Sequence, residues 1–209
     1  GLEDPSKCAE VDASSPGALP PAEAAEAVEI ARATLSALRA ERIAGRPAEP
    51  ARLEQALTEA EATGWEPIAI DTAMEVAAHE SLGGEHEAAL ERFEAAHYRN
   101  LALGRDVEAV DTALQAAALR GSRLKEYAPG LRWTSEAAAL IERTGNEESR
   151  QAHLLSTRAS VHMSHDDHAL ARADFEASLA KREALGQELR AASTRVNLSQ
   201  LLDEMDEYE

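Results

Sequence analysis

The sequence predicts an all-α fold, a right-handed α-solenoid of about four to five helical hairpins with about nine helices. Three observations support this prediction. The 209 residues are rich in Ala, Leu, Glu and Arg, which favour helix. There are few aromatic residues and no convincing run of alternating β-branched residues, so we expect no sheet. Finally, similar segments return at a nearly constant spacing, as in stacked helical repeats.

The clearest repeat relates residues 84–96 to residues 166–178. Gly84 corresponds to Asp166, His86 to His168, Ala89 to Ala171, Phe93 to Phe175 and Ala96 to Ser178. The two turns are 82 residues apart, which is two repeats of about 41 residues. Similar turn patterns at Gly45 and Asp206 continue the spacing. A hairpin of this length cannot bury its apolar face alone, so it is expected to stack on its neighbours.

Glycines, prolines and the apolar period set the expected helix boundaries. We expect helices at about 21–44, 48–62, 67–82, 85–103, 106–118, 130–144, 147–164, 167–185 and 187–205. The stretch before the sixth helix is irregular, because Gly121-Ser122 offers one turn and Pro129-Gly130 another. We expect a break near Ala128. Residues 123–127 are then either a short helical extra or part of a kinked helix.

The expected domain organisation is simple. Residues 1–20 carry Pro, Ser, Gly and Asp without a helical period and are interpreted as a linker or poorly ordered lead-in. Residues 21–209 form one repeat domain. Its last repeat is expected to be truncated, since the sequence stops just after Tyr208, where a partner helix would begin. An unpaired last helix exposes an apolar face, which favours self-association.

The charge excludes some classes of partner. The net charge is −18, with 39 acidic against 21 basic residues, so binding to nucleic acid or to an anionic membrane surface is not expected. A solvated helical surface explains the charge, and an acidic groove for a basic partner is the alternative. The lone Cys8 cannot form an internal disulfide, and this fits the cytoplasm.

No pattern indicates catalysis. The spacing of His162, His165 and His168 does not match a strong metal signature, so they are only weak metal candidates, and we expect no cofactor. Asp71 and Asp111 begin helices in two repeats and are explained by the helix dipole rather than by acid–base catalysis. There is no glycine-rich phosphate loop, nucleophile elbow or HExxH motif.

The better candidate site is a groove. The first helix of each stacked hairpin is expected to line a concave face, which suits an extended peptide or helix with some positive charge. The repeat register assigns the following residues to this face: Asp71, Met74, Ala78, Ser81, Asp111, Leu114, Ala118, His153, Ser156, Ser160, Met163, Gln200 and Asp203.

The repeats resemble tetratricopeptide (TPR) repeats. Four segments, GGEHEAALERFEAA, GLRWTSEAAALIERTG, DDHALARADFEASLAKREALG and TRVNLSQLLDEMDEYE, resemble the region that follows the kinase domain in large myxobacterial serine/threonine kinases. The resemblance covers about residues 21–209, and the 41-residue period is also similar to kinesin-light-chain-like arrays. It implies a sensing or docking arm that binds protein partners. The glycine-rich nucleotide loop, HRD and DFG motifs of the kinase are absent from this sequence, so no catalytic residue carries over.

These observations predict a non-enzymatic scaffold that binds a protein or peptide as the regulatory part of a signalling kinase. A peptide-sensing arm of an intracellular transcription or signalling regulator is the first alternative, and a metal-dependent enzyme using the histidine cluster is the second.

Overall fold

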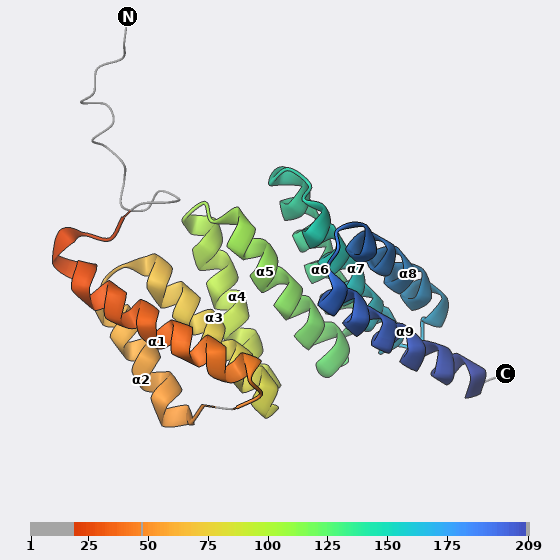
Figure 1. The fold of residues 1–209 in the computed structure, drawn as a ribbon, viewed down its shortest axis with the longest axis horizontal. Helices are drawn as coiled ribbons and strands as arrows, with labels where there is room; N and C mark the ends of the chain where they lie inside the picture. Colours follow the sequence, from red (N-terminus) through yellow and green to blue (C-terminus); the bar gives the residue numbers. More distant parts are fainter. Residues whose placement is uncertain (1–18, 47, 208–209) are drawn as a thin grey trace, which may run out of the picture. The chain divides into compact units, whose positions relative to one another are not determined.

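The computed structural model describes residues 19–46 and 48–207, with side chains described up to residue 205. Within these residues the chain is helical and contains no strand, which confirms the predicted all-α class. The elements are the 3₁₀ helix η2 (Ala22–Ala24), α1 (Ala25–Ile43), α2 (Pro50–Ala62), α3 (Glu66–Gly83), α4 (His86–Ala102), α5 (Asp106–Ala117), the π-helical η3 (Ala118–Arg123), α6 (Tyr127–Arg143), α7 (Glu148–Met163), α8 (His168–Ala184) and α9 (Glu188–Glu207) (Figure 1). Most of the expected lead-in lies outside the described residues.

The chain divides into two compact units, residues 1–105 and 106–209. In the first unit α1 packs against α2 and α3, and α3 packs against α2 and α4. In the second unit consecutive helices from α5 to α9 pack against each other. The alternate helices α5, α7 and α9 are also in contact, α7 with both of the others. Within each unit, therefore, contacts join helices that are close in sequence.

The aligned positions of residues 84–96 and 166–178 have similar backbone conformation and burial. Gly84 and Asp166, aligned as the turn position, both have left-handed backbones, with φ of 92° and 62°. The glycine adopts this conformation without steric cost, whereas the aspartate belongs to the few residue types that tolerate it. The three aligned packing pairs are all buried: Ala89 and Ala171, Phe93 and Phe175, Ala96 and Ser178.

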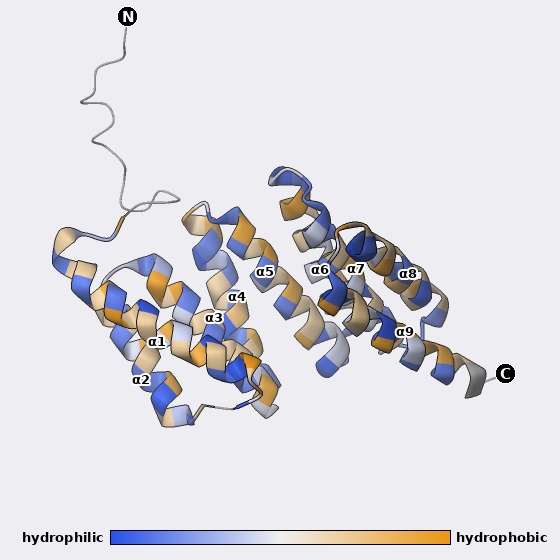
Figure 2. Ribbon diagram, viewed as in Figure 1, coloured by the Kyte–Doolittle hydropathy of each residue, from blue (hydrophilic) through white to orange (hydrophobic). Residues whose placement is uncertain are grey.

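Hydrophobic and hydrophilic residues interchange along the helices (Figure 2), and helices such as α1 and α2 bury one face, whereas α3 is buried around most of its circumference. In the first unit Val28, Leu35 and Ile68 form a buried cluster against which the partly buried Trp65 packs. In the second unit Phe175 packs with Ala159, Ala171 and Leu201, and Met163 covers this cluster.

The break predicted near Ala128 is misplaced. Helix α6 already begins at Tyr127, and Pro129 lies in its first turn, where a missing N–H breaks no intrahelical hydrogen bond. The actual break precedes it, where η3 ends with the bond from Leu124 N–H to the Leu119 carbonyl at 2.8 Å. Lys125 then reverses the chain with a φ of 59°. The helical extra expected at residues 123–127 is not found: residues 118–123 continue α5 as the π-helical η3, with Gly121 inside it rather than at a turn, and residues 124–126 lie between helices.

The turn expected at Asp206 is also absent, because α9 continues to Glu207. The segment Leu201–Glu207 contains neither glycine nor proline, so nothing in it ends the helix locally.

Candidate functional site

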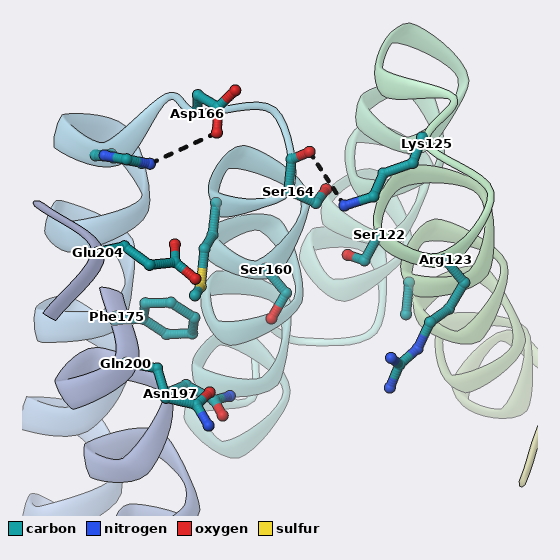
Figure 3. A pocket seen from close by; sticks show the side chains of 13 residues that line it. Ser122, Arg123, Lys125, Ser160, Ser164, Asp166, Phe175, Asn197, Gln200 and Glu204 are labelled. Carbon is teal, nitrogen blue, oxygen red and sulfur yellow. Dashed lines mark hydrogen bonds and ion pairs between the residues drawn. The ribbon is translucent and has the colours of Figure 1, made fainter. Parts of the chain in front are cut away.

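The second unit contains an open groove of about 600 Å³ between η3, α7 and α9. Figure 3 shows α7 at its floor, the end of η3 on one side and α9 on the other. The groove is lined by Ala118, Ser122, Arg123, Lys125, Ser160, Met163, Ser164, Asp166, His168, Phe175, Asn197, Gln200 and Glu204. Four of the residues assigned to the concave face are therefore brought together: Ala118, Ser160, Met163 and Gln200.

The floor of the groove combines a small polar residue with an apolar one. The Ser160 hydroxyl donates a hydrogen bond to the Ser156 carbonyl at 3.1 Å, so its donor is used within α7. Met163 lies half-buried on the Phe175 cluster. A flexible thioether at this point can adapt its shape to a partner's apolar side chain.

The two walls differ in charge. On the η3 side, Arg123 and Lys125 are exposed, and the Lys125 ammonium donates to the Ser164 carbonyl at 3.3 Å. On the α9 side, Asn197, Gln200 and Glu204 face the groove (Figure 3). The carboxylate of Asp166 lies at the rim, 3.8 Å from the His168 imidazole. The groove thus carries charges of both signs although the whole chain is strongly acidic.

The other candidates in this unit have different positions. Leu114 is only 1% exposed, so its assignment to the partner surface is wrong, because it belongs to the core between α5 and its neighbours. Asp111 and Asp203 are exposed, and His153 and Ser156 are half-buried, but these four do not line the groove.

None of the four candidates in the first unit, Asp71, Met74, Ala78 and Ser81, lines the cleft of this unit. The Asp71 carboxylate accepts a hydrogen bond from Arg105 at 2.7 Å, and this ion pair engages the group that we considered for acid–base catalysis. The Met74 sulfur accepts a weak contact from the Asn100 amide at 3.8 Å. Ser81 is half-buried near the end of α3. The cleft in this unit is lined by other residues.

The three histidines have separate environments. His162 is hydrogen-bonded through Nδ1 to the Tyr127 hydroxyl at 2.9 Å, and burial lowers its pKa. The His165 ring packs on the Tyr127 ring with centroids 4.5 Å apart. His168 faces Asp166. Among the residues that the structure describes, no group of three or more His, Cys, Asp or Glu side chains is placed to hold a metal ion.

Tyr127 connects the histidines to the turn before α8. Its hydroxyl donates to the Asp167 carboxylate, and this bond, the largest cause, raises the pKa of Tyr127 to about 12. On the other side, Nε2 of His162 lies 3.9 Å from an Asp174 oxygen, and Asp174 forms a two-point ion pair with Arg158 at 2.6 and 2.7 Å. This network joins α6, α7 and α8 and gives His162 and His165 a structural role.

His153 has the most perturbed imidazole. Burial, assisted by the positive charges of Arg182 and Arg190, lowers its pKa from 6.5 to about 4. At neutral pH its ring is therefore uncharged.

The depressed pKa of His153 predicts a specific pH dependence of stability. Below pH 6.5 the unfolded chain binds a proton at His153 while the folded chain does not, so this contribution to stability is present at neutral pH and is lost as pH falls toward 4. The difference in the free energy of unfolding between wild type and His153→Gln should fall by up to about 3 kcal/mol between pH 7 and pH 4. Urea unfolding of both proteins between pH 7 and pH 4.5 measures this change. An NMR titration in which the His153 imidazole of the folded protein takes up its proton near pH 6.5 would contradict the prediction.

Comparisons with known proteins add no assignment. No protein-family model matches the sequence, and no curated protein is significantly similar to it. None of the helices in the described ranges is long and apolar enough to span a membrane.

Proposed function

We propose that this chain is a non-catalytic protein-interaction scaffold of TPR-like helical repeats, which binds a peptide segment of a protein partner in the groove between η3, α7 and α9. We further propose that it serves as the regulatory or docking region of a bacterial serine/threonine kinase. The proposal depends mainly on one observation: the groove brings together four of the residues expected on the partner surface, Ala118, Ser160, Met163 and Gln200, from η3, α7 and α9.

The chemistry of the groove supports a peptide partner. Its floor offers the apolar surface of Met163, and its walls offer amides and charges from η3 and α9. Side-chain amides such as those of Asn197 and Gln200 can both donate and accept hydrogen bonds, as a peptide backbone requires. An open groove of this kind favours a docking surface over a closed receptor pocket for a small peptide.

The binding proposal is tested with peptides selected from a displayed random library on the wild-type chain. Gln200→Trp fills the groove from α9. In calorimetric titration it should lower the affinity for the selected peptides by about tenfold or more. The matched control Ser199→Trp adds the same side chain at the neighbouring exposed position, outside the groove lining, and should leave binding unchanged. Equal affinity of Gln200→Trp and wild type, with both folded by circular dichroism, would overturn the assignment.

The kinase context has its own test in the gene. A kinase domain encoded directly upstream of Gly1 is expected. An open reading frame that instead starts at this point would remove the kinase part of the proposal and leave the groove unaffected.

A further inference from the structure

The first unit contains a second cleft, between α2, α3 and α4, with a volume of about 630 Å³. Its lining is mostly apolar. Leu53 of α2 and Val76 of α3 are nearly fully buried and form its base, while Pro50 and Ala88 are exposed at its edges. Small and aliphatic side chains in this arrangement leave room for the apolar side chain of a partner.

Four glutamates surround this apolar base. Glu49 and Glu54 come from α2 and the residue preceding it, Glu80 from α3, and Glu85 from the residue preceding α4. The lining contains no lysine or arginine. Arg92, which lies outside the lining, pairs with Glu54 and with Glu80, the latter at 2.8 Å. One arginine thus partly offsets four carboxylates, and the cleft remains negative.

Glu49 and Glu85 are available to a partner. Both are exposed, and within residues 19–46 and 48–207 neither forms an ion pair with an arginine, lysine or histidine. This distinguishes them from Glu41, whose two carboxylate oxygens accept hydrogen bonds from the Arg52 guanidinium at 2.8 and 2.7 Å. A partner's cation placed between Glu49 and Glu85 would not have to displace a cation of the chain.

Glu80 supplies a further sign that the cleft lacks a cation. Its Oε1 accepts the bond from Arg92, but its Oε2 is buried and accepts no hydrogen bond from the described part of the chain. A buried carboxylate oxygen without a donor is energetically costly. Positive charge entering the cleft beside it reduces this cost.

The one histidine in the described lining, His79, is held by contacts within the chain. His79 accepts a hydrogen bond at Nδ1 from the Ala48 N–H at 3.4 Å, while its Nε2 lies 3.2 Å from the Leu38 carbonyl. Nε2 also lies 3.6 Å from a Glu75 carboxylate oxygen, so both ring nitrogens already contact groups of the chain.

We propose that this cleft is a second interaction site, which binds a basic amphipathic segment of a partner protein. An aliphatic side chain of the segment lies over Leu53 and Val76, and flanking lysine or arginine side chains pair with Glu49 and Glu85. The four carboxylates lie on or next to three different helices. They therefore favour a ligand that carries several positive charges along its length, such as a polypeptide, over a ligand with a single charge.

The probe is a fluorescein-labelled hexapeptide of sequence Lys-Arg-Leu-Leu-Arg-Lys with blocked ends. Fluorescence anisotropy should show saturable binding to the whole chain that weakens at least fivefold when salt is raised to about 0.3 M. The double variant Glu49→Gln with Glu85→Gln should weaken binding by about tenfold. Glu87→Gln with Glu91→Gln makes the same change in net charge at exposed positions of α4 outside the cleft, and should change binding less than twofold.

A second pair of variants tests the apolar base. Ala88→Arg places a cation in the cleft and should abolish binding, whereas Ala95→Arg, two turns further along the same helix and outside the lining, should not. The groove-filling Gln200→Trp should bind the probe normally, which separates this site from the proposed peptide groove. Equal losses in both glutamate doubles would indicate nonspecific attraction and overturn the proposal, as would full binding by Ala88→Arg.

Discussion

Replacing Gly130 with alanine is expected to destabilise the unit formed by residues 106–207 by about 3 kcal/mol or more. A Cβ at this position would lie 2.5 Å from the Gly121 Cα and 2.8 Å from its nitrogen. These are backbone atoms of η3, so no side chain can rotate away, and α6 and η3 have to separate. Thermal and urea unfolding, followed by helical circular dichroism, measures the effect.

Gly83→Ala is the matched control for this prediction. Its Cβ would meet no atom within 4 Å, and it is the last residue of helix α3. Because alanine has the higher helix propensity, Gly83→Ala should be neutral or stabilise by up to about 1 kcal/mol. A Gly130→Ala protein as stable as wild type would show that the α6–η3 contact is not as close as described.

The same junction offers a test by double mutation. A Cβ on Gly121 would lie 2.5 Å from the Val161 Cγ2 on α7, which is a side-chain atom. Gly121→Ala should therefore be partly rescued by Val161→Ala, which removes the obstructing methyl groups. A coupling free energy of about 1 kcal/mol or more is expected between the two substitutions, whereas independent positions would add.

Phe175→Ala is expected to cost about 3–5 kcal/mol of stability in the second unit. The ring is fully buried against Ala159, Ala171 and Leu201, so its removal leaves a cavity among α7, α8 and α9. The groove floor should also loosen, because Met163 rests on this cluster. Urea unfolding followed by Trp133 fluorescence, in a Trp65→Phe background, reports on this unit.

Two variants serve as comparisons. Leu170→Ala, on the same helix but 54% exposed, should cost less than about 1 kcal/mol. Phe93→Ala removes the aligned ring of the first unit, which is 2% exposed, and should cost an amount similar to that of Phe175→Ala. A small effect of Phe175→Ala would mean that the aligned positions do not have the same packing role.

The positions of the charged residues change what the net charge alone indicates about the partner. A net charge of −18 favours a basic partner for any surface of the chain. The groove in the second unit, however, has Arg123 and Lys125 on one wall and Glu204 on the other. A lining with four glutamates and, among the described residues, no lysine or arginine is found instead at the cleft of the first unit, where Arg92 from outside the lining pairs with two of the four. The repeat register did not indicate this cleft. Glu49 and Glu85 lie just before helices α2 and α4, and the helical periodicity does not predict where such residues point.

The aligned turn and packing positions and most helix ends could be derived from sequence because they depend on local preferences. Glycine after an amphipathic stretch ends a helix, as at Gly84, and the 3.6-residue period identifies Phe93 and Phe175 as inward positions. The irregular stretch before α6 was harder, because Pro129 is compatible both with a break and with a first helical turn.

The amino-acid sequence by itself determined the all-helical class, most helix boundaries and the aligned turn and packing positions, since each is set by backbone preferences and periodicity within one or two helices. Only the tertiary structure decided that Leu114 is core rather than surface, that Gly130 touches Gly121, and that Ser160, Met163 and Gln200 share a groove. Those properties depend on how far apart the helices lie and how each is rotated about its axis. Both are set by the packing of all neighbouring side chains together, which no local pattern contains.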